Sequence, residues 1–139
     1  TRMIEDFGGI AKQVPVLSAF FMVITLSSIG LPGLNGFVGE FLILLGSFRL
    51  NPAYAVIAAT GVILAAVYML HMYQRVFFGQ MTKGENRIIK DMDLREKIII
   101  IPIIIMIIWI GLYPGPFLSK MEPTVTALLD RVGHSRSLK

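Results

Sequence analysis

Two side chains within the long apolar stretches of this sequence could exchange protons near neutral pH. Glu40 is the one acidic residue embedded in such a stretch, and His71 lies in the next one. Acidic residues at membrane depth usually mark ion or proton pathways. The alternative for Glu40 is a static ion pair with a cation on another helix. An unperturbed pKa of about 6.5 suits His71 to a proton relay, but it lies about one turn from Arg75 and could equally be hydrogen-bonded near an interface.

The rest of the sequence offers little to hold a cofactor. There is no cysteine, which excludes disulfides, iron–sulfur ligation and thiolate metal sites. The sequence contains no phosphate-binding loop, no glycine-rich dinucleotide motif and no His/Asp/Glu cluster at metal-ligand spacing. We therefore expect any redox chemistry to happen elsewhere. The net charge of +4 lies in loops and tail, which indicates membrane topology rather than a nucleic-acid partner.

Three uncharged stretches must position these side chains. The chain has 139 residues, 55% hydrophobic and 16% charged, and no charge falls within 13–39, 50–74 or 98–119. Each stretch exceeds the roughly 20 residues that a helix needs to cross a bilayer. This pattern predicts an all-α fold, a fragment of a polytopic transmembrane helix bundle with about three spans. Because the first apolar run has no signal-peptide region before it, we expect the natural start to lie upstream of Thr1.

The first span is interrupted by the segment LPGLNG at 31–36, which ends four residues before Glu40. A break inside lipid must be sheltered by protein or line a polar cavity, because each freed backbone group costs several kcal/mol. Residues 15–48 form either one discontinuous span or two short spans in a hairpin. One broken span divides the Lys and Arg residues eight against five between the two sides, and the hairpin divides them seven against six, so the positive-inside rule favours the broken span.

Hydroxyl groups precede the break on Thr25, Ser27 and Ser28. They could hold water, bond to carbonyls freed by the break, or bond back to their own helix. The segments expected along the chain are a cytoplasmic loop (1–14), a broken transmembrane helix (15–48, with its break at 30–37), a transmembrane helix (53–78), a cytoplasmic loop (79–96), a transmembrane helix (97–113) and an amphipathic or disordered tail outside (114–139).

Three motifs in this order resemble a known family. They are GLPGLNGFVGEFLILLGSF (30–48), VYMLHMYQRVFFG (67–79) and DLRE (93–96). The sequence is similar over essentially its whole length to the C-terminal region of the M-type (subunit 4) antiporter-like subunits of respiratory NADH:quinone oxidoreductase. Members of that family have fourteen transmembrane helices, so the resemblance implies the last three, beginning with the discontinuous twelfth.

The resemblance also implies a role for Glu40, which matches the glutamate of the family's GEF motif in the broken helix. That glutamate belongs to a central axis of charged residues, whose lysines and second glutamate lie on earlier helices outside this sequence. The resemblance gives His71 no role. It implies proton translocation coupled to quinone reduction, neighbours in the membrane arm and the lipid bilayer as partners, and a multi-pass place in the bacterial inner membrane. NAD, FMN, iron–sulfur clusters and quinone are expected in partner subunits.

Two alternatives stay open. Subunits of Mrp-type cation/proton antiporters and of membrane-bound hydrogenases share this fold and a similar Gly-Pro motif, although the RVFFG and DLRE elements favour the respiratory enzyme. The second alternative is a structural membrane anchor in which Glu40 forms a static ion pair. A carboxylate that titrates near neutral pH argues against the anchor, and sodium-dependent transport without NADH oxidation favours the antiporter.

Overall fold

Helices make up the ordered elements of the chain. The computed structural model describes residues 4, 7–80 and 88–137, the last five as backbone alone, so the parts of the predicted loops and tail at 1–3, 5–6, 81–87 and 138–139 lie outside the described residues. Within the described part there are helices and no strand, which confirms the all-α class. In chain order they are η2 (Ile10–Lys12), α1 (Pro15–Ser28), α2 (Asn35–Leu50), α3 (Pro52–Tyr73), η3 (Gln74–Phe78), α4 (Leu94–Leu112) and α5 (Gly115–Ser137).

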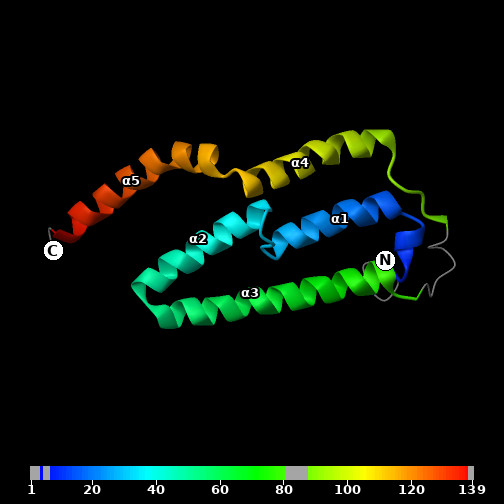
Figure 1. Cartoon of the computed structure of the whole chain (residues 1–139), viewed down its shortest axis with the longest axis horizontal. Helices are drawn as coiled ribbons and strands as arrows, with labels where there is room; N and C mark the ends of the chain where they lie inside the picture. The colour runs from blue at the N-terminus through cyan, green and yellow to red at the C-terminus, as the bar shows by residue number, and fades with distance from the viewer. Residues whose placement is uncertain (1–3, 5–6, 81–87, 138–139) are drawn as a thin grey trace.

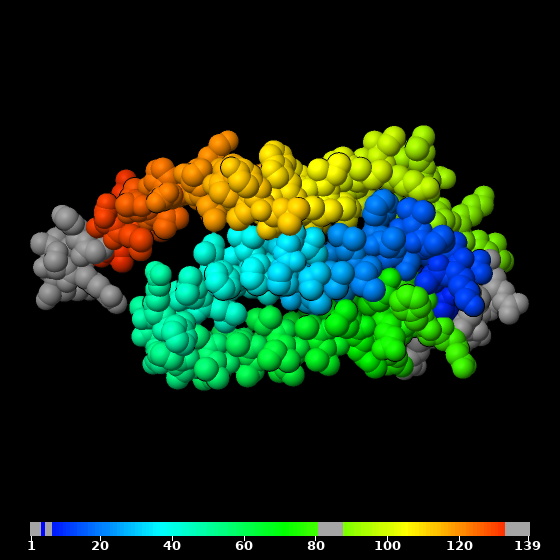
Figure 2. All heavy atoms as spheres, viewed as in Figure 1, coloured from blue at the N-terminus to red at the C-terminus, as the bar shows by residue number. Residues whose placement is uncertain are grey.

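The helices α1 and α2 follow one another along one line, as Figure 1 shows, instead of folding back on each other. The helix α3 runs back beside both of them, and α4 runs along their other side in the same sense as α1. The space-filling view places α1 and α2 between α3 and α4 (Figure 2). The helix α2 therefore continues in the direction of α1 after one interruption. That residues 15–48 cross a bilayer as one broken span stays a prediction.

In the part of the chain that the structure describes, one helix is long and apolar enough by itself to cross a membrane, namely Pro52–Phe78, which joins α3 and the π-helical turn η3. A second candidate arises if α4 and α5 are counted as one span bent by 73°. The helix α1 is apolar but shorter. A third crossing therefore depends on α1 and α2 acting together across their break.

Helix starts differ by a few residues from those predicted. The helix α4 begins at Leu94, within the DLRE segment and ahead of the span predicted at 97–113, because Asp93 and Glu96 form a capping box in which the Asp93 N–H donates to Glu96 Oε2 over 3.0 Å. The helix α2 begins at Asn35 instead of 37, so the interruption covers 29–34. The predicted tail is helical over α5.

Aromatic side chains fasten α1 to α3 near η2. Tyr73 and Phe77 are buried, and their ring centroids lie 4.7 Å apart. Phe21 of α1 packs on both, at 6.2 and 5.2 Å. With the buried residues Ile10 and Val14, these rings form the main core cluster of the chain. The cluster fixes one end of α1, and the interruption lies at its other end.

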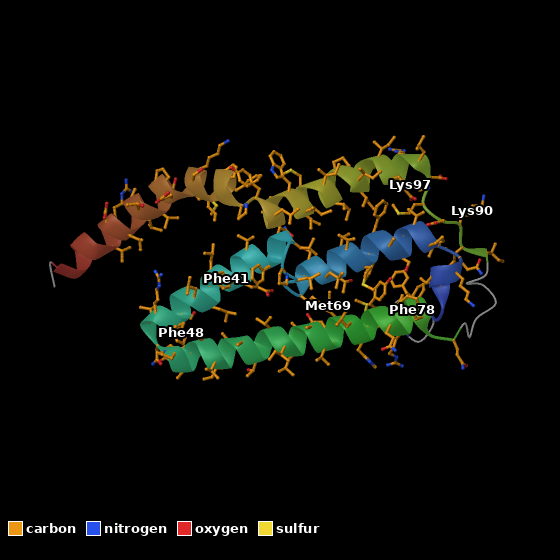
Figure 3. The ribbon with its side chains drawn as sticks, in the orientation of Figure 1. Phe41, Phe48, Met69, Phe78, Lys90 and Lys97 are labelled. Carbon is orange, nitrogen blue, oxygen red and sulfur yellow. The ribbon has the colours of Figure 1, made fainter. Side chains whose placement is uncertain are left out.

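Large apolar side chains cover the outer surface of the helices. None of the residues of α2 or α4 is buried, and Phe41 and Phe48 of α2, labelled in Figure 3, are 49% and 57% exposed. Apolar surface this extensive marks contact with lipid or with other proteins. The fold is therefore that of a layer of helices that is covered on its outside by an apolar environment.

Candidate functional site: the break between α1 and α2

The break begins where α1 is closed by a glycine in the left-handed conformation. The Leu31 N–H donates to the Leu26 carbonyl over 3.0 Å, and the Gly30 N–H donates to the Ser27 carbonyl over 3.2 Å, which is the pattern of a Schellman motif. Gly30 has a φ of 72° and Gly33 a φ of 94°. Residues with a side chain rarely adopt these angles, so the two glycines make the turn possible.

The start of α2 is fastened to the end of α1. The Ser27 hydroxyl donates a hydrogen bond to Asn35 Oδ1. The Gly36 backbone lies against the Ser27 carbonyl so closely that a Cβ on Gly36 would fall 1.8 Å from that oxygen. Asn35 and Gly36 thus belong to the helix and not to the break, which explains why the interruption is shorter than predicted.

The carboxyl group of Glu40 turns back towards the end of α1. A Cβ on Gly30 would lie 2.0 Å from Glu40 Oε2 and 2.9 Å from its Cδ, so the carboxyl group rests directly on the Gly30 backbone. Glu40 is half-buried. Its carboxyl group makes no hydrogen bond or ion pair with any residue in the described part of the chain. The static ion pair considered above would therefore need a cation from outside these residues.

The other hydroxyls before the break have separate environments. Ser28 donates to the carbonyl of Ile24 in its own helix, over 2.9 Å. Thr25 is 1% exposed, and its hydroxyl has no hydrogen-bond partner among the described residues. Of the three uses considered for these groups, back-bonding holds for Ser28, and Ser27 joins the two half-helices. The Thr25 hydroxyl is left as an unpaired polar group one turn before the break.

The helix α4 closes the break from one side. A Cβ on Gly111 would fall 2.3 Å from the Gly33 carbonyl oxygen and 2.4 Å from the Leu34 Cα, so the α4 backbone touches the backbone of the break. This close approach needs glycine on α4. Unwound backbone is therefore sheltered by protein on that side, as a break at membrane depth requires.

His71 is not brought to Glu40. Its side chain is exposed on α3. The turn at Asn51 joins α2 and α3, and His71 lies nine residues further from that turn than Glu40 does. At 1.5 Å per residue, the two positions are offset by about 13 Å along the helices. A direct hydrogen bond between them is excluded by this offset.

Sequence reasoning missed a carboxylate that caps α1. Asp91, in the segment before α4, accepts hydrogen bonds from the N–H groups of Val16 (2.9 Å), Leu17 (3.2 Å) and Met92 (2.8 Å). Desolvation raises the pKa of Asp91, but these bonds, together with the charge of Lys97, outweigh it and hold the pKa below its ordinary value of 3.8. One sign was present in the sequence, since α1 starts at a proline with no capping side chain before it.

A second missed contact joins the hydroxyl of Tyr73 to α1. It lies 2.9 Å from Ser18 Oγ and donates to the Ser18 carbonyl over 3.1 Å. Both residues are buried. As for metals, the described residues contain no group of three or more His, Asp or Glu side chains that could hold an ion. The ionisable side chain that the described residues place at the break is that of Glu40.

The chain is similar to proteins of one kind in each comparison. A family model described as "NADH:quinone oxidoreductase/Mrp antiporter, TM" matches residues 1–68. The chain is 46% identical over 129 residues to NADH-quinone oxidoreductase subunit M of Rickettsia typhi, covering 93% of this chain and 26% of that protein. It is 40% identical to NADH-ubiquinone oxidoreductase chain 4 of Marchantia polymorpha, over 94% of this chain and 26% of that one.

A solved structure shares the fold. The match is to a chain of respiratory complex I from Thermus thermophilus with bound NADH, at a TM-score of 0.79 and 33% identity, covering 86% of this chain and 25% of that chain. The resemblance predicted from the motifs is confirmed. The chain spans about a quarter of the length of the relatives it matches, so it corresponds to one part of such a protein.

Proposed function

Since the chain belongs, over 93% of its length, to the family of M-type antiporter-like subunits of NADH:quinone oxidoreductase, we propose that it is part of a proton-translocating subunit in the membrane arm of that enzyme. Its partners are the neighbouring membrane-arm subunits and the bilayer of the bacterial inner membrane. Quinone reduction in other subunits drives the transport. NAD, FMN, iron–sulfur clusters and quinone are held outside this chain.

One observation carries the proposal. The carboxyl group of Glu40 rests on the Gly30 backbone in the break and has no partner within the described part of the chain. A carboxyl group in such a position can take up a proton and give it back, since no fixed cation in these residues holds it ionised. Half-helix ends next to unwound backbone supply polar groups at membrane depth, and they support a charged state there.

In the mechanism that follows, Glu40 is the terminal protonatable site of the subunit. Electrostatic and conformational changes that originate at the quinone site alter the proton affinity of buried groups along the arm. Glu40 then receives a proton from groups on the earlier helices and releases it on one side of the membrane. His71, exposed on α3 and offset along the helices, is a second relay candidate that acts only through an intervening group.

The experiment is a comparison of Glu40→Gln with Glu122→Gln in the full-length subunit within the intact enzyme. The first change keeps the shape and removes the titratable group, and the second does the same at an exposed position on α5. We expect Glu40→Gln to lower both proton pumping and coupled quinone reduction while assembly is retained, and Glu122→Gln to leave both unchanged. Full activity in an assembled Glu40→Gln enzyme contradicts the proposal and supports the structural anchor.

A second candidate function deserves its own measurement, because the matching family model covers Mrp antiporters as well. In that function the same carboxyl group exchanges a proton against a cation without electron transfer. Sodium-dependent proton movement in membranes that lack NADH oxidation supports the antiporter. Proton movement that requires NADH and is indifferent to sodium supports the respiratory enzyme.

A further inference from the structure

We propose that Gly30 is a positioning residue for Glu40, and that its missing side chain creates the space in which the Glu40 carboxyl group lies. This inference rests on the proposed function of Glu40 and adds a second residue to it. Gly30 touches no transported proton. It acts by deciding where the carboxyl group can be.

A side chain at position 30 would collide with the carboxyl group of Glu40, most severely with Oε2. A Cβ on Gly30 would lie 2.0 Å from Glu40 Oε2, 2.9 Å from Cδ and 3.5 Å from Oε1. Any side chain at position 30 therefore occupies the place of the carboxyl group. The turn itself needs glycine for another reason, since φ is 72°. Gly30 thus has two roles, one for the backbone and one for Glu40, and they can be separated experimentally.

A methyl group at position 30 displaces Glu40 and leaves the helices in place. The clashing atoms belong to the far end of a flexible side chain, which can turn to another rotamer. The proton affinity of a carboxyl group depends on its neighbouring dipoles and on its burial, and both change when the group leaves the end of α1. The displaced carboxyl group of Glu40 therefore lies in a different environment.

Charged neighbours do not obscure this effect. The chain carries no charged residue from Gln13 to Gly39, so α1 presents no charged side chain to Glu40. The helix α4 meets the break at Gly111, and its charged residues lie in its first turn, at the opposite end. Residues that titrate or carry charge on α2, on α3 and in the first turn of α4 are Arg49, Tyr54, Tyr68, His71, Tyr73, Arg95, Glu96 and Lys97.

Gly33 provides a matched control. It is the other left-handed glycine of the same break, with φ of 94°, but a Cβ there meets only the Leu112 Cδ2 at 3.7 Å, an ordinary contact. Alanine at either position is strained by the positive φ. Only alanine at position 30 collides with Glu40. The difference between the two variants therefore isolates the displacement of the carboxyl group.

The experiment measures the pH profile of proton pumping and of coupled quinone reduction in the intact enzyme carrying Gly30→Ala or Gly33→Ala, with assembly measured alongside. We expect Gly30→Ala to shift the profile by about half a pH unit or more, whereas Gly33→Ala keeps the wild-type midpoint. Profiles that coincide for the two variants overturn the inference, because Gly30 then serves the backbone alone.

Glu40→Asp adds a test within the same enzyme. Aspartate is one methylene shorter, so its carboxyl group withdraws from Gly30. The shift of the pH profile caused by Glu40→Asp should therefore be smaller in the Gly30→Ala background than in the wild type, because both changes remove the same contact. Additive shifts overturn the inference. Glu40→Gln separates the two proposals. If Glu40→Gln retains pumping, both proposals are overturned. If Glu40→Gln loses pumping but Gly30→Ala and Gly33→Ala have the same pH profile, this inference alone is overturned.

Discussion

Replacing Asp91 by Asn weakens the attachment between the segment before α4 and the first turn of α1. The asparagine keeps an oxygen at the position that accepts from Leu17 and Met92, and it places an amide donor where Oδ2 accepts from Val16. One charge-assisted hydrogen bond and the interaction of the carboxylate with the helix dipole are lost. Allowing for partial exposure, the cost is about 1–2 kcal/mol.

The assay is hydrogen exchange at the amides of Val16 and Leu17 in the full-length subunit. A loss of about 1–2 kcal/mol raises the population of the open first turn roughly 5–30-fold, and exchange there accelerates by the same factor. Asp93→Asn is the control, because Asp93 caps α4 in the same chain segment. It accelerates exchange at the start of α4 and leaves α1 unchanged.

The pH dependence of this effect has a definite sign. The pKa of Asp91 is lowered in the folded state from the ordinary value of 3.8, so its stabilisation is fully present above pH 3.8 and is lost as the pH falls through the lower folded-state value. The difference between wild type and Asp91→Asn is therefore constant from about pH 8 to pH 5. Exchange at Val16 that is unaffected by Asp91→Asn, or equally accelerated by Asp93→Asn, refutes the reasoning.

Four further changes test the packing of the helices. Tyr73→Phe removes the partner of the buried Ser18 hydroxyl and the second hydrogen bond to the Ser18 carbonyl, so thermal unfolding should show a loss of about 1–3 kcal/mol. Unchanged stability contradicts the contact. Gly111→Ala places a Cβ 2.3 Å from the nearest carbonyl oxygen of the break and should lower the stability of the fold by about 1–3 kcal/mol. The control is Gly61→Ala, whose Cβ would lie in open space and which should raise the stability by up to about 1 kcal/mol. Thr25→Val removes an unpaired hydroxyl and should leave stability equal or up to about 1 kcal/mol higher; a clear loss would show that the hydroxyl has a partner.

Local chemistry explains which parts of the fold were predictable. Uncharged stretches predict helices, and a proline between glycines predicts an interruption, because both follow from neighbours in the sequence. The place where α2 resumes was predicted two residues late, since it depends on Ser27 reaching Asn35 and on Gly36 packing against the α1 backbone. Those contacts arise only when the two half-helices are already side by side.

Contacts between distant residues account for what the sequence did not predict. Asp91 is 75 residues from Val16, and Tyr73 is 55 residues from Ser18. Neither pair leaves a periodic pattern. Glu40 was singled out as an acid in an apolar stretch, but its contact with Gly30 depends on how its side chain turns. The roles of Glu40 and His71 stay predictions, and His71 lies away from the break.

The central claim is that the Glu40 carboxyl group changes its protonation state during turnover. Infrared difference spectroscopy of the intact enzyme, before and after reduction with NADH, observes the carboxylic acid band directly. We predict a band that disappears in Glu40→Gln and persists in Glu122→Gln. A difference spectrum in which Glu40→Gln matches the wild type contradicts the account, because the proton then moves through other groups.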